Sequence, residues 1–210
     1  MRYFNSLPYL TTTDYTGNTY ALKNLLVRTE LIPQLAKNPI LFYQYSLQDG
    51  DTPENVANRY YGDSYRYWVV LYGNPNILDP QWDWPLSNQQ FQAYLIDKYT
   101  TDAGGAQKVL SYIQATIHHY EKIITTIDNS TATTAIKTVE VDLNTYNSIM
   151  PFSQTQKFSD GTSVTYTLSK NAVSIYDYEL KTNEAKRNIN LINSSYASDM
   201  ETQYKKLVSL

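Results

Sequence analysis

Few residues in this 210-residue chain have the side chains that catalysis or metal binding requires. The chain has no cysteine, and its two histidines are adjacent, at His118 and His119. Adjacent residues of a β-strand point to opposite faces, so these two rings are not expected to share a metal ion or to act as a base and its partner. The lack of cysteine excludes disulfides and thiolate metal sites. The sequence therefore predicts no metal site and no cofactor.

Two carboxylates, Glu54 and Asp63, could in principle form a glycosidase pair, but each has a structural explanation. Glu54 lies in the first turn of a predicted helix, where the helix dipole favours negative charge, and Asp63 is placed to cap the next helix. The chain has no nucleophile elbow, phosphate-binding glycine loop or zincin motif. We therefore predict no catalytic residue and no enzymatic activity. A cell-wall hydrolase, the weakest alternative, would need a catalytic domain that the sequence does not reveal.

The residues around this pair predict a strand followed by two short helices. Apolar and polar side chains alternate from Tyr43 to Leu47, and Asp49-Gly50 then favours a turn. Thr52 is a typical N-cap, and Pro53 suits the first helical position because a missing N–H costs nothing there. Gly62 should end the first helix, and Gly73 should end a second helix that carries Trp68.

This segment resembles a LysM module, a binding fold and not an enzyme. The resemblance implies that the loops Gly50 to Pro53 and Asn74 to Ile77 would hold N-acetylated sugars, as they do in peptidoglycan-binding members. The second strand of a LysM module is not found after Ile77, where Asp79-Pro-Gln-Trp-Asp-Trp-Pro follows, and this disfavours glycan binding. The residues that match the LysM pattern are Tyr45, Gly50, Asp51, Thr52, Ala57, Asn74 and Ile77.

Along the whole chain the sequence predicts an α+β protein in three consecutive parts. Residues 1–40 have little periodicity and are expected to form an N-terminal arm that orders against a partner. Residues 41–103 form the LysM-like domain with the tryptophan loop and a further helix, which Ser87 and Gln90 cap. Residues 104–210 form a C-terminal α+β region: a meander of weak strands, a helix from Tyr176 to Arg187, a strand around Ile189 to Ile192 and a last helix.

Composition points to protein partners. The net charge of −3 and the lack of a basic run argue against nucleic acid, and no run of eighteen apolar residues suggests a membrane span. The chain has 21 tyrosines, a residue type enriched at protein interfaces. Trp82 and Trp84 could each be buried under the next helix or exposed to a partner. The candidate partner contacts are Phe4, Tyr65, Arg66, Trp82, Trp84, Tyr196 and Tyr204.

Nearly the whole chain resembles the baseplate wedge protein of contractile-tailed bacteriophages that carries a LysM-like domain, of the type found in T-even phages. The most specific motifs are Thr52-Pro-Glu-Asn-Val-Ala, Tyr61-Gly-Asp, Tyr67-Trp-Val-Val-Leu, Asp79-Pro-Gln-Trp-Asp-Trp-Pro, Tyr178-Glu, Asn183-Glu-Ala-Lys-Arg and Ile189-Asn-Leu-Ile.

This second resemblance implies a structural protein of the virion that is assembled in the host cytoplasm. It would bind other baseplate wedge proteins and join neighbouring wedges into the ring around the hub, without catalysis. A peptidoglycan-binding LysM module of a phage tail or cell-wall protein is the alternative. A fold resemblance alone does not decide between them.

Overall fold

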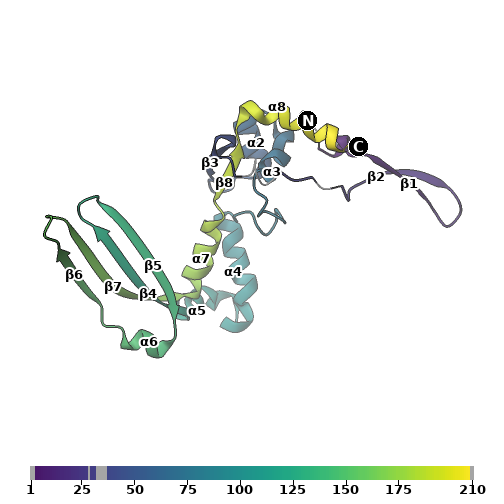
Figure 1. The fold of residues 1–210 in the computed structure, drawn as a ribbon. Helices are drawn as coiled ribbons and strands as arrows, with labels where there is room; N and C mark the ends of the chain where they lie inside the picture. Colours follow the sequence, from purple (N-terminus) through teal and green to yellow (C-terminus); the bar gives the residue numbers. More distant parts are fainter. Residues whose placement is uncertain (1–2, 28, 32–36, 209–210) are drawn as a thin grey trace. The chain divides into compact units, whose positions relative to one another are not determined.

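The computed structural model describes residues 3–27, 29–31 and 37–208, and it confirms the α+β class (Figure 1). The strands are β1 (Tyr9–Thr13), β2 (Thr19–Lys23), β3 (Phe42–Ser46), β4 (Ile117–Asp128), β5 (Thr133–Val141), β6 (Phe152–Lys157), β7 (Ser163–Ser174) and β8 (Asn188–Ile192). The α-helices are α2 (Pro53–Tyr61), α3 (Tyr67–Tyr72), α4 (Asn88–Ala103), α5 (Val109–Ala115), α6 (Leu143–Ser148), α7 (Ile175–Ala185) and α8 (Ala197–Val208). The 3-10 turns are η1 (Tyr3–Ser6), η2 (Pro39–Leu41), η3 (Ser64–Arg66), η4 (Ala106–Lys108) and η5 (Ser194–Tyr196).

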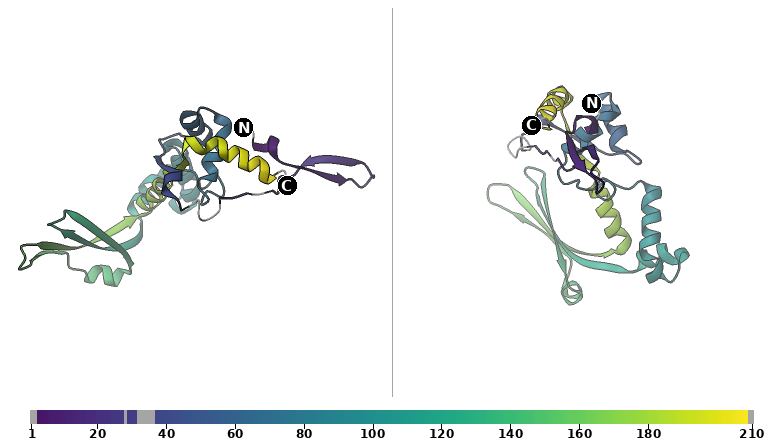
Figure 2. Two further views of the ribbon diagram at one scale, coloured as in Figure 1. Left: turned by 45° about the horizontal axis from the view of Figure 1, so that its top comes forward. Right: turned by 90° about the vertical axis from the view of Figure 1, so that its right-hand side faces the viewer.

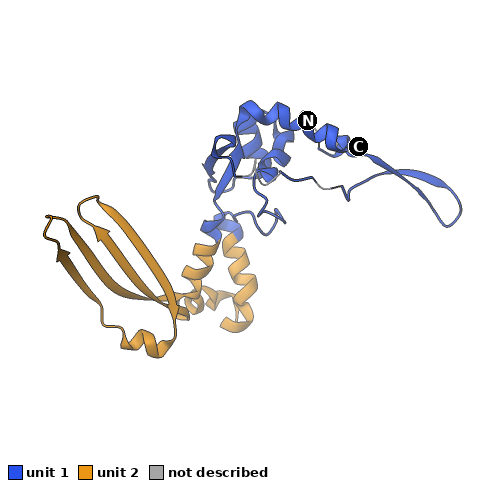
Figure 3. Ribbon diagram, in the orientation of Figure 1, with its two compact units in different colours: residues 1–90, 183–210 blue, residues 91–182 orange. Residues whose placement is uncertain are grey.

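The chain divides into two compact units, and one of them is built from two separate stretches of the sequence (Figure 3). Unit 1 consists of residues 1–90 and 183–210, and unit 2 consists of residues 91–182. This division differs from the three consecutive parts expected from the sequence, because the last elements of the chain pack with the first. Asn183 marks the return to unit 1: its side chain accepts a hydrogen bond from the Leu86 N–H at 2.8 Å and donates one to the Leu86 carbonyl at 3.1 Å.

The centre of unit 1 is the predicted strand–helix–helix segment, closed by a strand from the far end of the chain. β3 pairs antiparallel with β8, from Phe42 opposite Ile192 to Ser46 opposite Asn188. The predicted caps of α2 are confirmed: Thr52 accepts a hydrogen bond from the Asn55 N–H, and Gly62 ends the helix at φ 72°. No strand lies between Ile77 and α4, as expected.

Gly73 has a second role besides ending α3. Its backbone is right-handed, at φ −70°, so that conformation does not require glycine. A Cβ atom at this position would lie only 2.8 Å from the Asn190 carbonyl oxygen of β8. Gly73 therefore lets α3 approach β8 closely.

One hydrophobic core holds unit 1 together and includes residues from both ends of the chain. Leu7, next to the N-terminal turn η1, is buried in it, and so are Tyr204 and Val208 of α8. Burial of apolar area at about 25 cal/mol per Å² is the main force that holds such elements together. The buried core residues are Leu7, Leu47, Val56, Ala57, Tyr61, Trp68, Val69, Val70, Trp84, Ile189, Leu191, Ile192, Ala197, Tyr204 and Val208.

The expected N-terminal arm contains regular structure that its sequence did not predict. β1 and β2 form an antiparallel hairpin, with Leu10 opposite Leu22. Asp14 holds its turn by accepting hydrogen bonds from the N–H groups of Thr16 and Asn18, each at 2.9 Å. β1 is exposed along its whole length, and β2 along all but its last residue. Residues 28 and 32–36 of the expected arm lie outside the described residues.

Unit 2 combines helices with a four-stranded antiparallel sheet in the order β5-β4-β7-β6 (Figure 2). The predicted capping box at the start of α4 is confirmed, because Gln90 accepts from the Ser87 N–H at 3.0 Å and donates its own N–H to the Ser87 hydroxyl. The predicted meander of strands did not include the helices α5 and α6. Ala115 is the last residue of α5.

Candidate partner-binding surfaces

The loop that follows β3 is held by internal ionic and hydrogen bonds. The buried Asp51 carboxylate accepts from the Gln48 N–H at 2.9 Å and from Arg59 Nη2 at 2.9 Å. Arg59 also donates to the Tyr45 hydroxyl, and its hydrogen bond to Asp51 raises the pKa of the Arg59 guanidinium. Gly50 provides the left-handed conformation of the turn, at φ 77°. Tyr45, Gly50 and Asp51 of the predicted pattern thus act together as a structural clamp.

Trp84 packs against this loop from the core of unit 1. Its side chain is 7% exposed, and its indole Nε1 donates to the Asp51 carbonyl oxygen at 2.7 Å. Asp49 accepts a hydrogen bond from the Asn88 N–H at 2.9 Å, which ties the same loop to the start of α4. The hydrogen-bonding groups that a sugar would need in this loop are therefore partly used by the protein itself.

Asn74 in the second predicted loop also bonds inward. Its side-chain amide donates to the carbonyl oxygens of Val70 and Asn190, both at 2.8 Å, and accepts from the Asn190 N–H at 2.8 Å. Three of the four hydrogen bonds that an Asn amide can make are thus used, and two of them join the end of α3 to β8. Of the remaining pattern residues, Ala57 is fully buried and Ile77 packs against the core.

The seven candidate partner contacts differ in exposure, and Arg66 is intermediate. Trp82, Phe4, Tyr65 and Tyr196 are 66%, 55%, 48% and 39% exposed. Trp84 and Tyr204 lie in the core and do not offer their rings to a partner in this conformation. The sequence left open whether Trp82 and Trp84 are buried or exposed. In the structure Trp84 is buried and Trp82 is exposed.

Most of these residues gather around α8. Arg66 Nε donates to Glu201 Oε1 of α8 at 2.8 Å. Tyr204 of α8 lies 5.0 Å from both the Tyr3 and the Trp68 ring centroids, and Phe4 is edge-on to Tyr3. The apolar stripe of this helix therefore covers the core of unit 1.

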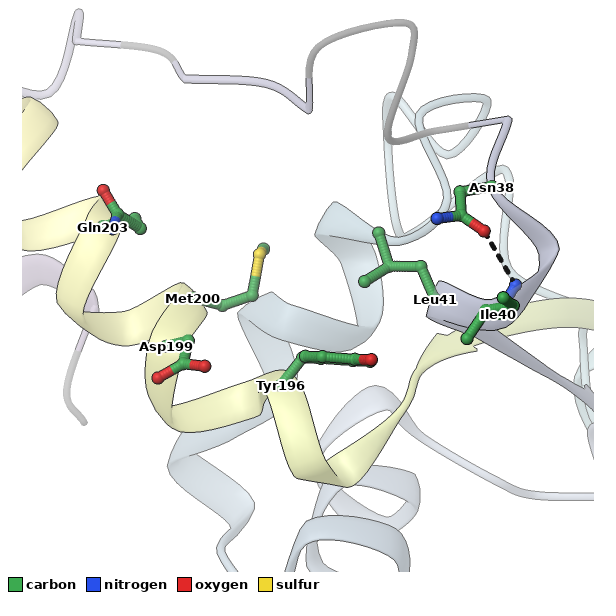
Figure 4. Close-up of a pocket in the computed structure, with 7 residues that line it drawn as sticks. All are labelled: Asn38, Ile40, Leu41, Tyr196, Asp199, Met200 and Gln203. Carbon is green, nitrogen blue, oxygen red and sulfur yellow. Dashed lines mark hydrogen bonds between the residues drawn. The ribbon is translucent and has the colours of Figure 1, made fainter.

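An apolar groove lies beside the start of α8 (Figure 4). Ile40 and Leu41 of η2 form one side, and Tyr196 and Met200 form the other. The groove has a volume of about 300 Å³, the low end of what ligand pockets enclose. Sequence reasoning found Tyr196 and missed Ile40, which is 70% exposed and has no periodic pattern around it. The full lining is Asn38, Ile40, Leu41, Tyr196, Asp199, Met200 and Gln203.

The β1–β2 hairpin presents a second apolar surface on unit 1. Leu10, Leu22 and Tyr20 share one face because Leu10 pairs with Leu22 and Thr12 with Tyr20. These three side chains are 49%, 56% and 48% exposed. A two-stranded hairpin alone is at best marginally stable in water, so this face is suited to packing against something else.

The histidine pair of unit 2 corrects one premise of the sequence analysis. A bulge in β4 shifts the register between Ile117 and His119, so the two rings meet instead of pointing to opposite faces. Their Nδ1 atoms are 2.8 Å apart, and the His118 ring stacks on Tyr178 at 3.8 Å between centroids. Among the described residues, no group of three or more His, Cys, Asp and Glu side chains is arranged to hold a metal ion.

An ionic cluster around the buried Glu179 joins α4 to α7 within unit 2. Glu179 is buried and accepts from Lys98 Nζ and from the Tyr99 hydroxyl, both at 2.6 Å. Burial alone would raise the pKa of this carboxyl, but the hydrogen bonds from Lys98 and Tyr99 outweigh it and lower the pKa. Burial also raises the pKa of Tyr99 to about 12. Every charge of the cluster is thus paired, as expected for a structural ion pair.

The comparison with known families decides the class of protein. A family described as Base plate wedge protein 53 matches residues 3–210. The chain belongs to this family. No curated protein matches the chain. Membership assigns a structural role in a phage baseplate, together with other baseplate proteins, in the tail of the virion. In the described part of the chain, no helix combines the length and apolar character needed to cross a membrane.

Proposed function

We propose that this wedge protein joins neighbouring wedges into the baseplate ring, through exposed apolar surfaces of unit 1. The observation that carries the proposal is the hairpin face of Leu10, Leu22 and Tyr20, whose apolar side chains are half exposed. The groove at Tyr196 and the exposed Trp82 offer further contact sites, and large aromatic residues are common interface hot spots. Assembly would take place in the host cytoplasm, in a contractile tail of the T-even type.

We also propose that the centre of unit 1 is a LysM-like module used as a scaffold for protein binding. The order β3, α2, α3, β8 supports this, with β8 in place of the strand that is missing after Ile77. In this proposal unit 2 is an insertion between the second helix and the second strand. The inward hydrogen bonds of Asp51 and Asn74 support a structural use of the two loops.

Ring assembly from wedges that carry hairpin variants tests the main proposal. The double variant Leu10→Asp/Leu22→Asp places two carboxylates on the apolar face. The control Thr11→Asp/Ala21→Asp places the same directly opposed pair on the other face of the same hairpin. Opposed like charges cost both variants a similar amount of hairpin stability, so a difference between them reports the partner contact.

We expect the first variant to accumulate separate wedges and the control to form rings, as counted in electron micrographs of baseplates from infected cells. Rings in normal yield from the Leu10→Asp/Leu22→Asp variant would contradict a hairpin contact. A density map of the whole tail that lacks this subunit between adjacent wedges would contradict the joining role itself.

Peptidoglycan binding is the alternative from a different class, and a titration with chitooligosaccharides separates the two. With the Asp51 carboxylate and the Asn74 amide bonded internally, we expect no saturable binding at millimolar sugar. Saturable binding that is lost in an Asn76→Ala variant would favour the glycan-binding module, because Asn76 is an exposed residue of the second loop.

A further inference from the structure

The sheet of unit 2 has two faces of different chemistry, which follow from its register. Residues directly opposite each other on paired strands share a face. Lys122 of β4 is opposite Val139 of β5 and Lys170 of β7, and Ile124 is opposite Lys137 and Leu168. We name the side that carries these residues the lysine face. Ile123, Thr125 and Ile127 of β4 point to the other side, which we name the threonine face.

The threonine face satisfies its polar groups within the sheet. Thr155 and Thr165 share a hydrogen bond of 2.9 Å, and Ser153 and Thr167 share one of 3.0 Å. Asn129 also donates to the Thr165 hydroxyl at 3.0 Å. Ile136 is exposed on this face. Ser and Thr are nevertheless the commonest residues of the threonine face, and their hydroxyl groups suit contact with water.

The lysine face presents large apolar side chains instead. Ile124, Leu168 and Phe152 form one row across β4, β7 and β6, because Leu168 pairs with both of the others. Phe152, Tyr166 and Val139 are 52%, 41% and 39% exposed. The strands β5 and β6 are exposed along nearly their whole length, while α6 packs beside this row, with Tyr146 against Tyr120 and Lys170.

The charges on this face have one predominant sign. Within the described residues, neither Lys122 nor Lys137 belongs to an ion pair, whereas Lys170 donates to the Tyr146 carbonyl at 3.0 Å. The strand glutamates Glu121 and Glu140 are opposite each other on the threonine face. Asp128, the acid at the far end of the lysine face, accepts from the turn N–H of Ser130 at 2.8 Å. The apolar row is therefore bordered by cations that lack partners of opposite charge.

We propose that the lysine face is a docking surface for another baseplate protein, whose contacting surface combines apolar side chains with Asp and Glu. Exposed apolar side chains supply the area that such an interface buries, and the lysines select an acidic partner. The partner class rests on the proposed structural function, but the surface is separate from the hairpin and groove of unit 1. This assigns unit 2 a binding role of its own.

Lysine acetylation of the free protein and of intact tail particles tests the site. We expect Lys122 and Lys137 to react in the free protein and to react at least about tenfold more slowly in the particle, because burial in an interface excludes the reagent. Lys157 at the end of β6 is the matched control, since it lies on the threonine face opposite Ser163. Equal reactivity of Lys122 and Lys157 in the particle would overturn the inference. A particle that lacks the chain would instead overturn the proposed function.

Zero-length carbodiimide coupling in the same particles identifies the occupant, because it joins a lysine amine to a carboxylate in contact with it. Bonds from Lys122 or Lys137 to Asp or Glu of a different protein would support the proposal. Bonds to a second copy of this chain, or to unit 1 of the same chain, would overturn it. So would protection of both lysines without any coupling, because the occupant would then not be acidic.

Charge reversal gives an independent test in the assembled state. The variant Lys122→Glu/Lys137→Glu should keep its circular dichroism spectrum, because both are sheet-surface residues, and should enter tails at least about tenfold less well, because like charges are then opposed. Lys157→Glu should enter at the normal level. Normal entry of the double variant would contradict an acidic partner.

Discussion

The core of unit 1 and the sheet of unit 2 use apolar residues in opposite ways. Unit 1 brings together residues from both ends of the chain, since Leu7, Trp68 and Tyr204 belong to one core. The sheet of unit 2 forms from a single stretch of chain, and apolar side chains such as Phe152 and Ile136 remain exposed on it. The core of unit 1 uses its apolar side chains for its own stability, whereas the sheet, like the exposed hairpin of unit 1, keeps many of them available to partners.

This difference separates the residues that maintain the fold from those that are free to serve assembly. A substitution in unit 1 that breaks a long-range contact should lower the free energy of unfolding in the isolated protein. A substitution on the sheet or on the exposed hairpin should leave that free energy nearly unchanged and act only when partners are present.

Rearranging the chain should produce the largest effect. A chain that ends at Arg187 lacks β8 and α8, so β3 loses its partner and unit 1 should not fold. A chain in which a short Gly/Ser linker replaces residues 91–182 keeps every element of unit 1. The linker can be short because Leu86 and Asn183 are hydrogen-bonded to each other. We expect a cooperative thermal transition by circular dichroism from the second chain and none from unit 1 in the first. Two unfolded proteins would show that unit 1 depends on unit 2.

Substitution of the buried Trp84 should give the next largest loss of stability, in contrast to substitution of its neighbour Trp82. Trp84→Ala removes a buried ring and its hydrogen bond to Asp51, which should lower the free energy of unfolding by about 3–5 kcal/mol. Trp82→Ala is the matched control: Trp82 is 66% exposed, so its change should stay within about 0.5 kcal/mol. Urea unfolding of both variants measures the difference. Equal losses would mean that the loop does not divide into a buried and an exposed side.

Sequence reasoning succeeded where the signal was local. Caps and turn residues such as Thr52, Gly62 and Ser87 act over three or four positions, and the structure confirms the helices that they predict. The strand at Ile189 to Ile192 was also predicted, but its pairing with β3 was not, because nothing in a short window records which distant strand completes a sheet.

Side-chain placement at the candidate sites was less predictable for the same physical reason. Tyr204 and Tyr196 look alike in sequence, yet one ring is buried under residues from the N-terminus and the other borders a groove. The bulge at His118 depends on the pairing of β4 with β7, so alternation alone gave the wrong geometry for the histidines. Ile40 was missed because only the fold places it in one groove with Tyr196 and Met200, which are distant in sequence.

Substitution of Gly73 should lower the free energy of unfolding moderately, because α3 and β8 approach each other closely at this residue. In Gly73→Ala the new Cβ would lie 2.8 Å from the Asn190 carbonyl oxygen, so overpacking should cost about 1–3 kcal/mol of the free energy of unfolding. Gly62 is the comparison, because its φ of 72° favours glycine while a Cβ added there would meet no atom within 4 Å. Asparagine tolerates that conformation, so Gly62→Asn should be mild and Gly73→Asn severe. The opposite order in urea unfolding would exclude a steric role for Gly73.

Loss of the Asp14 carboxylate should give the smallest effect on stability, because it should destabilise only the hairpin. The hydrogen bond from the Thr16 hydroxyl is the main cause that lowers the pKa of Asp14 from 3.8 to about 2. Because the folded pKa lies below the ordinary value, the stabilisation of the turn is complete above about pH 4 and is lost as the pH falls toward 2. Below pH 4, exchange at the Thr16 and Asn18 amides should therefore lose its protection relative to the intrinsic exchange rate at the same pH, and so should exchange at neutral pH in Asp14→Ala.

Asp102→Ala, at an exposed position of α4, is the control for this last change and should leave hairpin exchange unaltered. The core amides of β8 should exchange at unchanged rates in both variants, because the Asp14 turn makes its hydrogen bonds only within the hairpin. If Asp14→Ala also accelerated exchange in β8, the hairpin would be coupled to the core. The contrast between a self-contained scaffold and exposed surfaces that await partners would then not hold for unit 1.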